Sequence, residues 1–214
     1  MSQLTDYYRE RATEYDAVYS KPERQPDLAR LHNLLPDLVR NRSILEVAAG
    51  TGYWTATLST AAQAITATDL NDETLQIART REYGPASVTI QTADAFDLKA
   101  IPGEFDTAFA GFFWSHVPRA QVASFTRRLR DRIGPGGQLI VLDNRYVEGS
   151  NQPITRTSVD GDTYQTRSLN DGRMFEVLKN FPSQRQFIAD VAPIAASVQW
   201  TELAYFWLAT ITLK

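Results

Sequence analysis

Short apolar runs alternate along the first two thirds of the chain with segments whose apolar residues recur at helical spacing. We predict strands at 43–48, 64–68, 87–91, 105–110 and 138–142. We predict helices near 26–40 and at 53–62, 71–82 and 119–133. Such alternation is typical of βαβ units around a parallel sheet that is buried on both faces. Ligands of these sheets collect at the carboxyl ends of the strands.

The pattern changes after residue 143. The stretch 153–179 is polar, and the turn pairs Asp160-Gly161 and Asp171-Gly172 separate runs of alternating residues. Asp-Gly between alternating runs favours hairpins, so we predict a small antiparallel meander. A helix at 183–192 and two closing strands at 197–203 and 205–213 complete the prediction.

The first 40 residues predict two helical segments, and the tyrosines of the first segment are in a position to cover a ligand. Residues 2–20 are polar, and Tyr8, Tyr15 and Tyr19 lie at helical or near-helical spacing. The following helix carries a leucine face. Ordinary packing of an N-terminal helix is the alternative explanation for the tyrosines.

Composition narrows the candidate chemistry. With 214 residues the chain suits one domain, and it has no cysteine, so disulfides, thiolate metal sites and a cysteine nucleophile are excluded. Only His32 and His116 are present, so no multi-histidine metal site is expected. A net charge of -3 without a basic block argues against nucleic-acid binding. No signal-peptide pattern or membrane-length apolar run is present, so we expect a cytoplasmic protein.

The stretch "ILEVAAGTGYWT" indicates a nucleotide-binding turn between a strand and a helix. We expect Gly50 to form the tight turn and Gly52 to let the backbone approach a ligand. Thr55 stands where a dinucleotide fingerprint has its third glycine, and no lysine follows at phosphate-loop spacing. These features favour a ligand with an adenosine and no phosphate. Asp69 ends the second strand, where a carboxylate can take both ribose hydroxyls, and Asp94 follows the third, within reach of an adenine amino group.

Two further polar residues, one inside a predicted strand and one just after another, are candidates for a functional role. Glu46 is inside the first strand and needs hydrogen-bonding partners there. We expect them to be backbone amides, an amino-acid ammonium group, or purely structural partners. His116 follows the fourth strand in "WSHVP", where an imidazole can act as a general base or can be structural. His32, in the leucine-rich helix, is expected to be structural.

Five motifs in order over residues 42–143 resemble the class I, Rossmann-like S-adenosylmethionine-dependent methyltransferases of small-molecule type. They are "LEVAAGTG", "TATDLN", "TADAFDL", "FDTAFAGFFWSHVP" and "LRDRIGPGGQLIVLD". "YYRERATEYDAVY" is similar to the N-terminal lid of many members. The resemblance implies an α/β fold: a seven-stranded, mostly parallel sheet with helices on both faces and an antiparallel insertion after the fifth strand. One domain would comprise a lid (1–40), a cofactor-binding core (41–144), a substrate cover (145–180) and closing elements (181–214).

The resemblance also implies S-adenosyl-L-methionine as cofactor, S-adenosyl-L-homocysteine as product, and a set of contact residues. Gly50 and Gly52 would face the methionine part, Asp69 would bind ribose, and Gly111 and Phe112 would offer backbone contacts to the ammonium group. The other expected cofactor-binding residues are Tyr19, Glu46, Ala48, Trp54, Leu70, Asp94, Ala95 and Phe96.

Expectations for the acceptor are coarser. We expect methyl transfer to an oxygen, a nitrogen or a carboxylate of a small molecule, without a metal, and with His116 as the base for a protonated acceptor. The expected substrate residues are Tyr8, Tyr15, Trp114, Arg145 and Tyr146, whereas Arg156 and Arg167 on the hairpin are expected to be solvated. A non-catalytic cofactor-binding module and a nicotinamide-dependent dehydrogenase are the alternatives. The chain can be a monomer or a homodimer.

Overall fold

A seven-stranded sheet forms the centre of the computed structural model, which describes residues 3–214, with side chains from Thr5 onward. The strand order is β3-β2-β1-β4-β5-β10-β9, and the first five strands are parallel to one another. β10 is antiparallel to both of its neighbours. The strands are β1 (Ser43–Val47), β2 (Ala64–Asp69), β3 (Ser87–Thr92), β4 (Thr107–Gly111), β5 (Gln138–Asn144), β9 (Ala195–Glu202) and β10 (Phe206–Leu213). The predicted α/β fold is confirmed.

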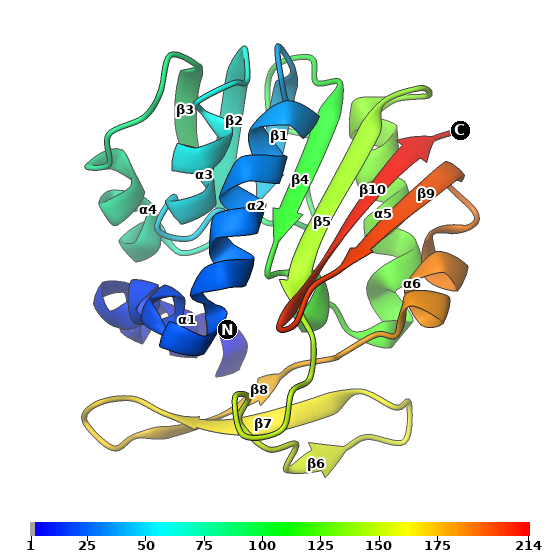
Figure 1. Ribbon diagram of the computed structural model, residues 1–214. Coiled ribbons are helices and arrows are strands. Elements are labelled where there is room, and N and C mark those ends of the chain that lie inside the picture. Colours follow the sequence, from blue (N-terminus) through cyan, green and yellow to red (C-terminus); the bar gives the residue numbers. More distant parts are fainter. Residues whose placement is uncertain (1–2) are drawn as a thin grey trace.

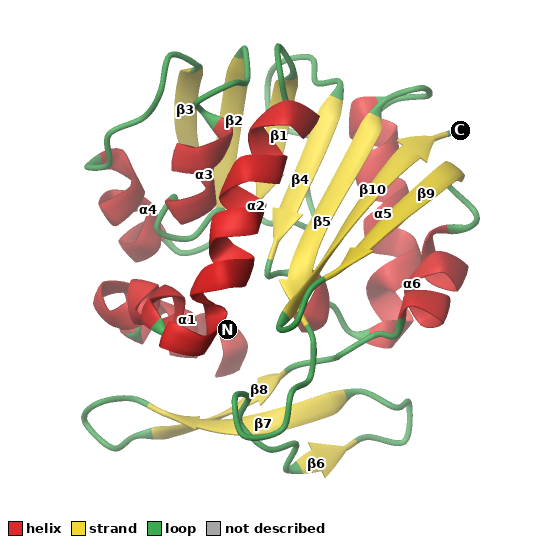
Figure 2. Cartoon of the chain, in the orientation of Figure 1, coloured by secondary structure: helices red, strands yellow, loops and turns green. Residues whose placement is uncertain are grey.

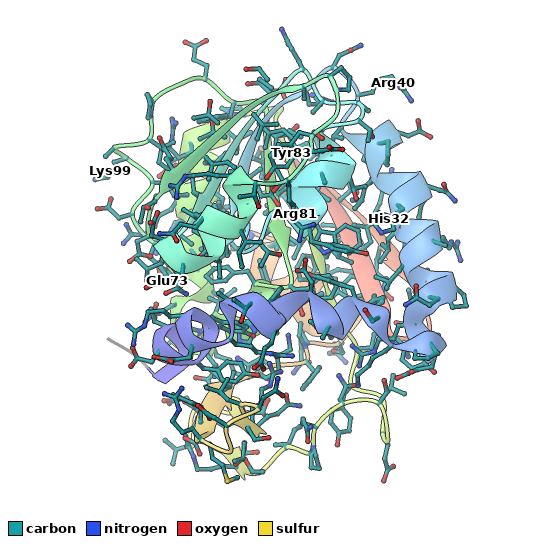
Figure 3. All side chains as sticks on the ribbon, turned by 90° about the vertical axis from the view of Figure 1, so that its left-hand side faces the viewer. His32, Arg40, Glu73, Arg81, Tyr83 and Lys99 are labelled. Carbon is teal, nitrogen blue, oxygen red and sulfur yellow. The ribbon has the colours of Figure 1, made fainter. Side chains whose placement is uncertain are left out.

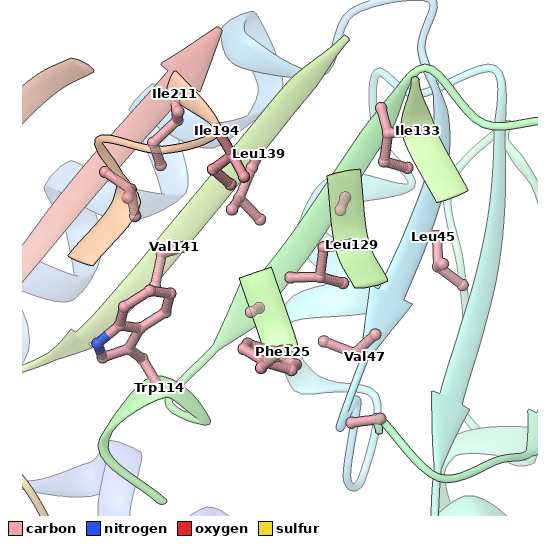
Figure 4. Packing of buried hydrophobic residues seen from close by; sticks show 14 of the residues in the cluster. Leu45, Val47, Trp114, Phe125, Leu129, Ile133, Leu139, Val141, Ile194 and Ile211 are labelled. Carbon is pink, nitrogen blue, oxygen red and sulfur yellow. The ribbon is translucent and has the colours of Figure 1, made fainter. Parts of the chain in front are cut away.

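Helices cover both faces of this sheet, as Figure 1 shows. They are α2 (Gln25–Leu38), α3 (Tyr53–Leu58), α4 (Asp72–Arg79), α5 (Arg119–Ile133) and α6 (Gln184–Val191). Successive strand residues point to opposite faces. Leu45 and Val47 of β1 therefore join the core with α5 and α6, and Ile44 joins the core with α2 and α3. Figure 4 shows the α5 side of this packing.

The helix after β1 is shorter than the predicted 53–62 and ends at Leu58. The hydroxyl of Ser59 donates to the carbonyl of Ala56, and that of Thr60 donates to the carbonyl of Thr57. Serine and threonine side chains that bond to the nearby backbone compete with helix continuation. The predicted order of strand, glycine-rich loop and helix is nevertheless present, and the loop lies at the carboxyl end of β1.

A second, three-stranded antiparallel sheet lies beyond the carboxyl ends of the parallel strands (Figure 2). It contains β6 (Arg156–Thr157), β7 (Thr163–Ser168) and β8 (Met174–Leu178), so the predicted meander is present, with a first strand of only two residues. We call residues 145–180 the cover. Tyr7 of α1 (Gln3–Glu10) is buried against Leu169 and Val177 of the cover.

The N-terminal segment runs under the same edge of the sheet (Figure 3). After α1 it continues as 3-10 helices η1 (Ala12–Ser20) and η2 (Pro22–Arg24). The guanidinium of Arg81, labelled in Figure 3, donates to the carboxylate of Asp16 in η1 and to the carbonyl of Thr51 in the glycine-rich loop. Arg81 thereby joins η1 of the N-terminal segment, which was predicted to be a lid, to the glycine-rich loop. The first two residues of the N-terminal segment lie outside the described residues.

Within the described part of the chain, no helix is both long enough and apolar enough to cross a membrane. The same residues contain no cluster of histidine, aspartate and glutamate that could hold a metal ion.

Candidate functional site

A cavity of about 270 Å³ opens at the carboxyl ends of β1, β2 and β4. The strand order reverses between β1 and β4, and open α/β sheets bind ligands at such switch points. Ala48 and Phe112, which follow these two strands, have positive φ angles of 52° and 59°. Non-glycine residues in this conformation are strained and concentrate at functional sites. The lining residues include Ala48, Gly50, Asp69, Leu70, Asn71, Thr74, Ala93, Asp94, Ala95, Phe96, Gly111, Phe112 and Phe113.

The two glycines of the loop have different roles. Gly50 lines the cavity, and a Cβ added to it would meet nothing within 4 Å. Gly52 does not line the cavity: an added Cβ would lie 2.6 Å from the hydroxyl of Tyr83 and 3.1 Å from Cβ of Ala78. Only Gly50 therefore leaves space for a ligand at the backbone. Gly52 is required by the packing of α3 on α4, contrary to the expectation that it faces the cofactor.

Asp69 is held in place by its neighbours in the backbone. Its carboxylate accepts from the amide of Gly50 at 2.9 Å and from the amide of Asn71 at 2.8 Å. Burial raises the pKa of Asp69, although these bonds oppose the shift. Asp94 is exposed at the cavity edge, and its carboxylate accepts from the amide of Phe96 at 2.8 Å. Two carboxylates thus lie along a cavity with an apolar wall of Leu70, Ala95 and Phe96. This combination fits an adenosine, whose hydroxyls and amino group donate and whose ring is flat.

Besides Gly52, three residues expected at the cofactor do not line this cavity. Glu46 is buried under the loop, where the hydroxyl of Thr55 donates to it at 2.7 Å, and burial raises its pKa to about 8. Trp54 is buried and stacks on Phe112, with ring centroids 5.9 Å apart. Tyr19 stacks on Tyr53 at 3.8 Å and lines a second cavity instead. These three side chains support the loop and the wall of the first cavity.

The second cavity has a volume of about 210 Å³ and lies between the N-terminal segment and the cover. Basic side chains from both segments line it, and none of its lining residues is acidic. The basic residues are Arg11, Lys21, Arg24, Arg167 and Lys179. Sequence patterns did not indicate these five, and Arg167, which was expected to be solvated, is half-buried here. Arg156 is exposed as expected and pairs with Glu176 at 2.6 Å.

Four residues line both cavities: Tyr8, Tyr15, Phe112 and His116. Nδ1 of His116 lies 2.6 Å from the carbonyl oxygen of Leu178, which can only accept, so Nδ1 carries the proton. Nε2 of the neutral ring is then an acceptor, and the hydroxyl of Tyr8 donates to it at 2.8 Å. Burial first, and then the charges of Lys179 and Arg167, hold the pKa of His116 well below its usual range. A neutral imidazole whose Nε2 can accept a proton is the form that a general base needs, although the hydroxyl of Tyr8 occupies Nε2 here.

The other expected substrate residues lie elsewhere. Trp114 is buried in the core, where its ring contacts Phe125 and Phe187. Figure 4 shows Trp114 and Phe125. Arg145 donates to the carbonyl of Leu203 and pairs with Glu202 at 3.0 Å. Tyr146 is exposed and packs against Phe181. None of these three lines either cavity. His32 bonds to Thr57 and Tyr53, as a structural histidine should.

Comparisons with known proteins agree with this geometry. Residues 44–137 match the model of a family described as "Methyltransferase domain". The structure of the DhpI–SAM–HEP complex is similar to this chain, with a TM-score of 0.76 and 30% identity over 97% of this chain and 95% of that chain. The DhpI–SAH complex has the same TM-score, with 29% identity over 99% of this chain and 95% of that chain.

A demethylmenaquinone methyltransferase of Clavibacter sepedonicus is 31% identical over 107 residues. That match covers 49% of this chain and only 42% of the relative's length, so it concerns less than half of the relative. Together with the glycine-rich loop, the strand-end carboxylates and the strand order, these similarities establish the family. The chain belongs to the class I S-adenosylmethionine-dependent methyltransferases.

Proposed function

We propose that this methyltransferase transfers the methyl group to an oxygen or nitrogen of a small-molecule acceptor held in the second cavity. The observation that carries this proposal is the wall of four residues that both cavities share. A cofactor in the first cavity and an acceptor in the second would meet at Tyr8, Tyr15, Phe112 and His116. The second cavity, at about 210 Å³, has the size for a small molecule.

Each wall of the first cavity suits one part of the cofactor. The carboxylate of Asp69 would accept from the ribose hydroxyls, and that of Asp94 from the adenine amino group. Leu70, Ala95 and Phe96 would contact the ring. Gly50 and Gly111, at the ends of β1 and β4, would leave the backbone accessible to the methionine part.

S-adenosylmethionine supplies a methyl group that is already electrophilic, because the sulfur to which it is bonded carries a positive charge. The protein has to align the acceptor atom with that methyl group and exclude water, and such alignment contributes up to ~7–11 kcal/mol to lowering a barrier. The N-terminal segment and the cover enclose the two cavities and would supply the exclusion.

For a hydroxyl acceptor, His116 would take the proton. The acceptor oxygen would bond to the methyl carbon as the carbon–sulfur bond breaks, the bonding pair would pass to sulfur, and the proton would pass to Nε2 of His116. The hydroxyl of Tyr8 now occupies Nε2, so it would rotate aside or relay the proton. An acceptor without a proton to lose, such as a carboxylate or a tertiary amine, would need alignment alone.

The test is transfer of labelled methyl from S-adenosylmethionine to a panel of small hydroxyl, amine and carboxylate compounds. For a hydroxyl acceptor we expect His116→Ala to lower kcat by about 10²–10⁴-fold with little change in S-adenosylhomocysteine affinity. His32→Gln is the matched control, because the hydrogen bonds of His32 within the described residues go to Thr57 and Tyr53 and this residue lines neither cavity.

Two results would contradict the proposal. Full activity of His116→Ala on a hydroxyl acceptor would remove the base role and leave alignment as the mechanism. Tight cofactor binding without transfer to any acceptor class would instead favour a non-catalytic binding module.

A further inference from the structure

We propose that the acceptor is a small anion whose oxyanion group, a carboxylate or a phosphate-type group, is bound by the basic side chains of the second cavity. This inference rests on the proposed function, because it concerns the acceptor of that same site. It adds the charge of the acceptor and names the residues that would bind it: Arg11, Lys21, Arg24 and Arg167.

The charges in this cavity are not balanced by the protein. Among the residues that the structure describes, five basic ones line it and no aspartate or glutamate does. Lys179 pairs with Asp143 at 3.1 Å. For the other four basic residues, the structure over residues 3–214 shows no salt bridge to a carboxylate. For Lys21 and Arg24 the nearest acidic residue along the chain is Glu23, whose exposed carboxylate accepts from the hydroxyl of Ser150 at 3.0 Å.

The four unpaired cations bond to neutral groups. Lys21 and Arg24 both donate to the carbonyl of Ser150, at 2.7 and 3.1 Å, so their charges are neighbours. Arg167 donates to the hydroxyl of Tyr8 at 3.3 Å and to the side-chain carbonyl of Gln165 at 2.9 Å. Arg11 donates to the hydroxyl of Tyr7 at 2.7 Å. These bonds fix the positions of the side chains without a carboxylate of the described residues in contact with them, and only Lys21 and Arg24 feel the charge of Glu23.

Burial makes this arrangement costly without an anion. Arg24 is 4% exposed, and burial lowers its pKa. The charge of Arg167 lowers this pKa further, whereas the charge of Glu23 opposes the shift. A buried cation without a counter-charge is unfavourable, and guanidinium groups bind carboxylates and phosphates with paired hydrogen bonds. An oxyanion in the cavity would supply the missing charge.

The cation positions also place the anion close to the reaction. Arg167 contacts Tyr8, and Tyr8 contacts His116, in the wall shared with the cofactor cavity. Arg11, Lys21 and Arg24 come from the N-terminal segment, whereas Arg167 comes from the cover. An anion bound by both segments would hold them together over the site and leave another part of the acceptor beside His116.

The carboxylate of the cofactor's methionine part is the competing occupant. The methionine part is a zwitterion, so its own ammonium offsets that carboxylate, and one carboxylate would leave most of the four charges unbalanced. A nucleic acid does not fit a cavity of about 210 Å³ in a chain of net charge -3. A small anionic acceptor is therefore the occupant that matches both the charge and the size.

The experiment titrates the S-adenosylhomocysteine complex with sodium phosphate or sodium acetate at constant ionic strength, and follows heat and melting temperature. We expect the wild type to bind at least one of the two anions saturably. The anion that binds with the higher affinity indicates whether the acceptor carries a phosphate-type group or a carboxylate. Arg167→Gln should bind it at least tenfold more weakly, with S-adenosylhomocysteine affinity within twofold of wild type. Arg156→Gln is the control, because this arginine lies on the same cover but lines neither cavity. If Arg167→Gln fails to fold, Arg11→Gln serves the same purpose.

Three outcomes would overturn the inference. If the S-adenosylhomocysteine complex forms normally but binds neither phosphate nor acetate, an anionic acceptor is excluded and methyl transfer stays intact. The same conclusion follows if Arg167→Gln binds the anion as tightly as the wild type does. A tenfold loss of S-adenosylhomocysteine affinity in Arg167→Gln would assign the cations to the cofactor. Failure of the wild type to bind S-adenosylhomocysteine at all would instead contradict the proposed function itself.

Discussion

Nζ of Lys179 lies 3.1 Å from Oδ1 of Asp143, and both side chains are buried. Lys179 directly follows β8 of the cover, and Asp143 is at the end of β5 in the central sheet. The carboxylate of Asp143 also accepts from the backbone amide of Ser115, at 2.8 Å, next to His116. One buried ion pair thus joins the cover, the sheet and the segment that carries the candidate base.

We expect Asp143→Asn to destabilise the protein by roughly 3–5 kcal/mol, because it leaves the ammonium of Lys179 buried without a counter-charge. Lys179→Met should cost less, since Asp143 keeps the amides of Ser115 and Asn144 as partners. The double variant should recover part of the loss. Urea unfolding of the three variants measures this. A double variant as unstable as the sum of the single ones would show that the two side chains do not interact.

Glu46 predicts a pH dependence of stability. Burial raises its pKa to about 8 in the folded protein, so the folded state holds a proton that the unfolded chain releases near its ordinary pKa of ~4.3. The favourable contribution of this group is complete below the unfolded pKa and is lost as pH rises through about 8. We expect Glu46→Gln to gain on the order of 2 kcal/mol over wild type between pH 5 and pH 8.5, measured by urea unfolding of the free protein. Parallel pH profiles would show that Glu46 is ionised in the folded state.

The two loop glycines should separate binding from stability. Both have positive φ, 57° at Gly50 and 75° at Gly52, so alanine at either position costs about 1 kcal/mol of unfolding free energy. Gly52→Ala should cost more, because its Cβ would collide with Tyr83, and adding Tyr83→Phe should restore part of the loss. Gly50→Ala should mainly weaken S-adenosylhomocysteine binding. Calorimetry and thermal melts on the same samples would show whether these two effects separate.

Asp69→Ala should weaken S-adenosylhomocysteine binding by about tenfold to a hundredfold, because the hydrogen bonds that this carboxylate would accept from the ribose hydroxyls would be lost. Asp94→Ala should lose about fivefold, since that carboxylate is exposed and would accept a single bond. Asp97→Ala, on an exposed neighbour that lines neither cavity, is the control. Equal affinity in all three variants would exclude Asp69 as the ribose ligand.

His116 predicts the acid side of the activity profile. The ordinary pKa of histidine is about 6.5, and the pKa of His116 lies well below it. The ring of His116 is therefore still neutral at pH 6.5. The rate with a hydroxyl acceptor should therefore hold a plateau from pH 8 down past 6.5 and fall only at lower pH. The predicted plateau can be tested by measuring kcat against pH for the wild type and for Tyr8→Phe. A fall in kcat centred above pH 6.5 would mean that His116 is not the titrating base.

The sequence by itself determined the sheet, the loop and the cofactor. Parallel strands show as apolar runs because both faces are buried, and residues that follow such strands meet at one edge whatever the details of packing. Asp69, Asp94 and Gly50 could therefore be placed together from their positions after predicted strands. Family resemblance then supplied the identity of the ligand.

The tertiary structure alone decided which side chains face the cavities. Gly52, Trp54 and Trp114 follow the same strands as the cavity residues. The side chains of Trp54 and Trp114 nevertheless point into the hydrophobic core, and the space beside Gly52 is filled by Tyr83 and Ala78. Arg11, Arg24 and Arg167 are more than 140 residues apart at their extremes, and no periodicity connects them. They meet because the cover folds back over the N-terminal segment, and such long-range pairing depends on the packing of the whole chain rather than on any local pattern.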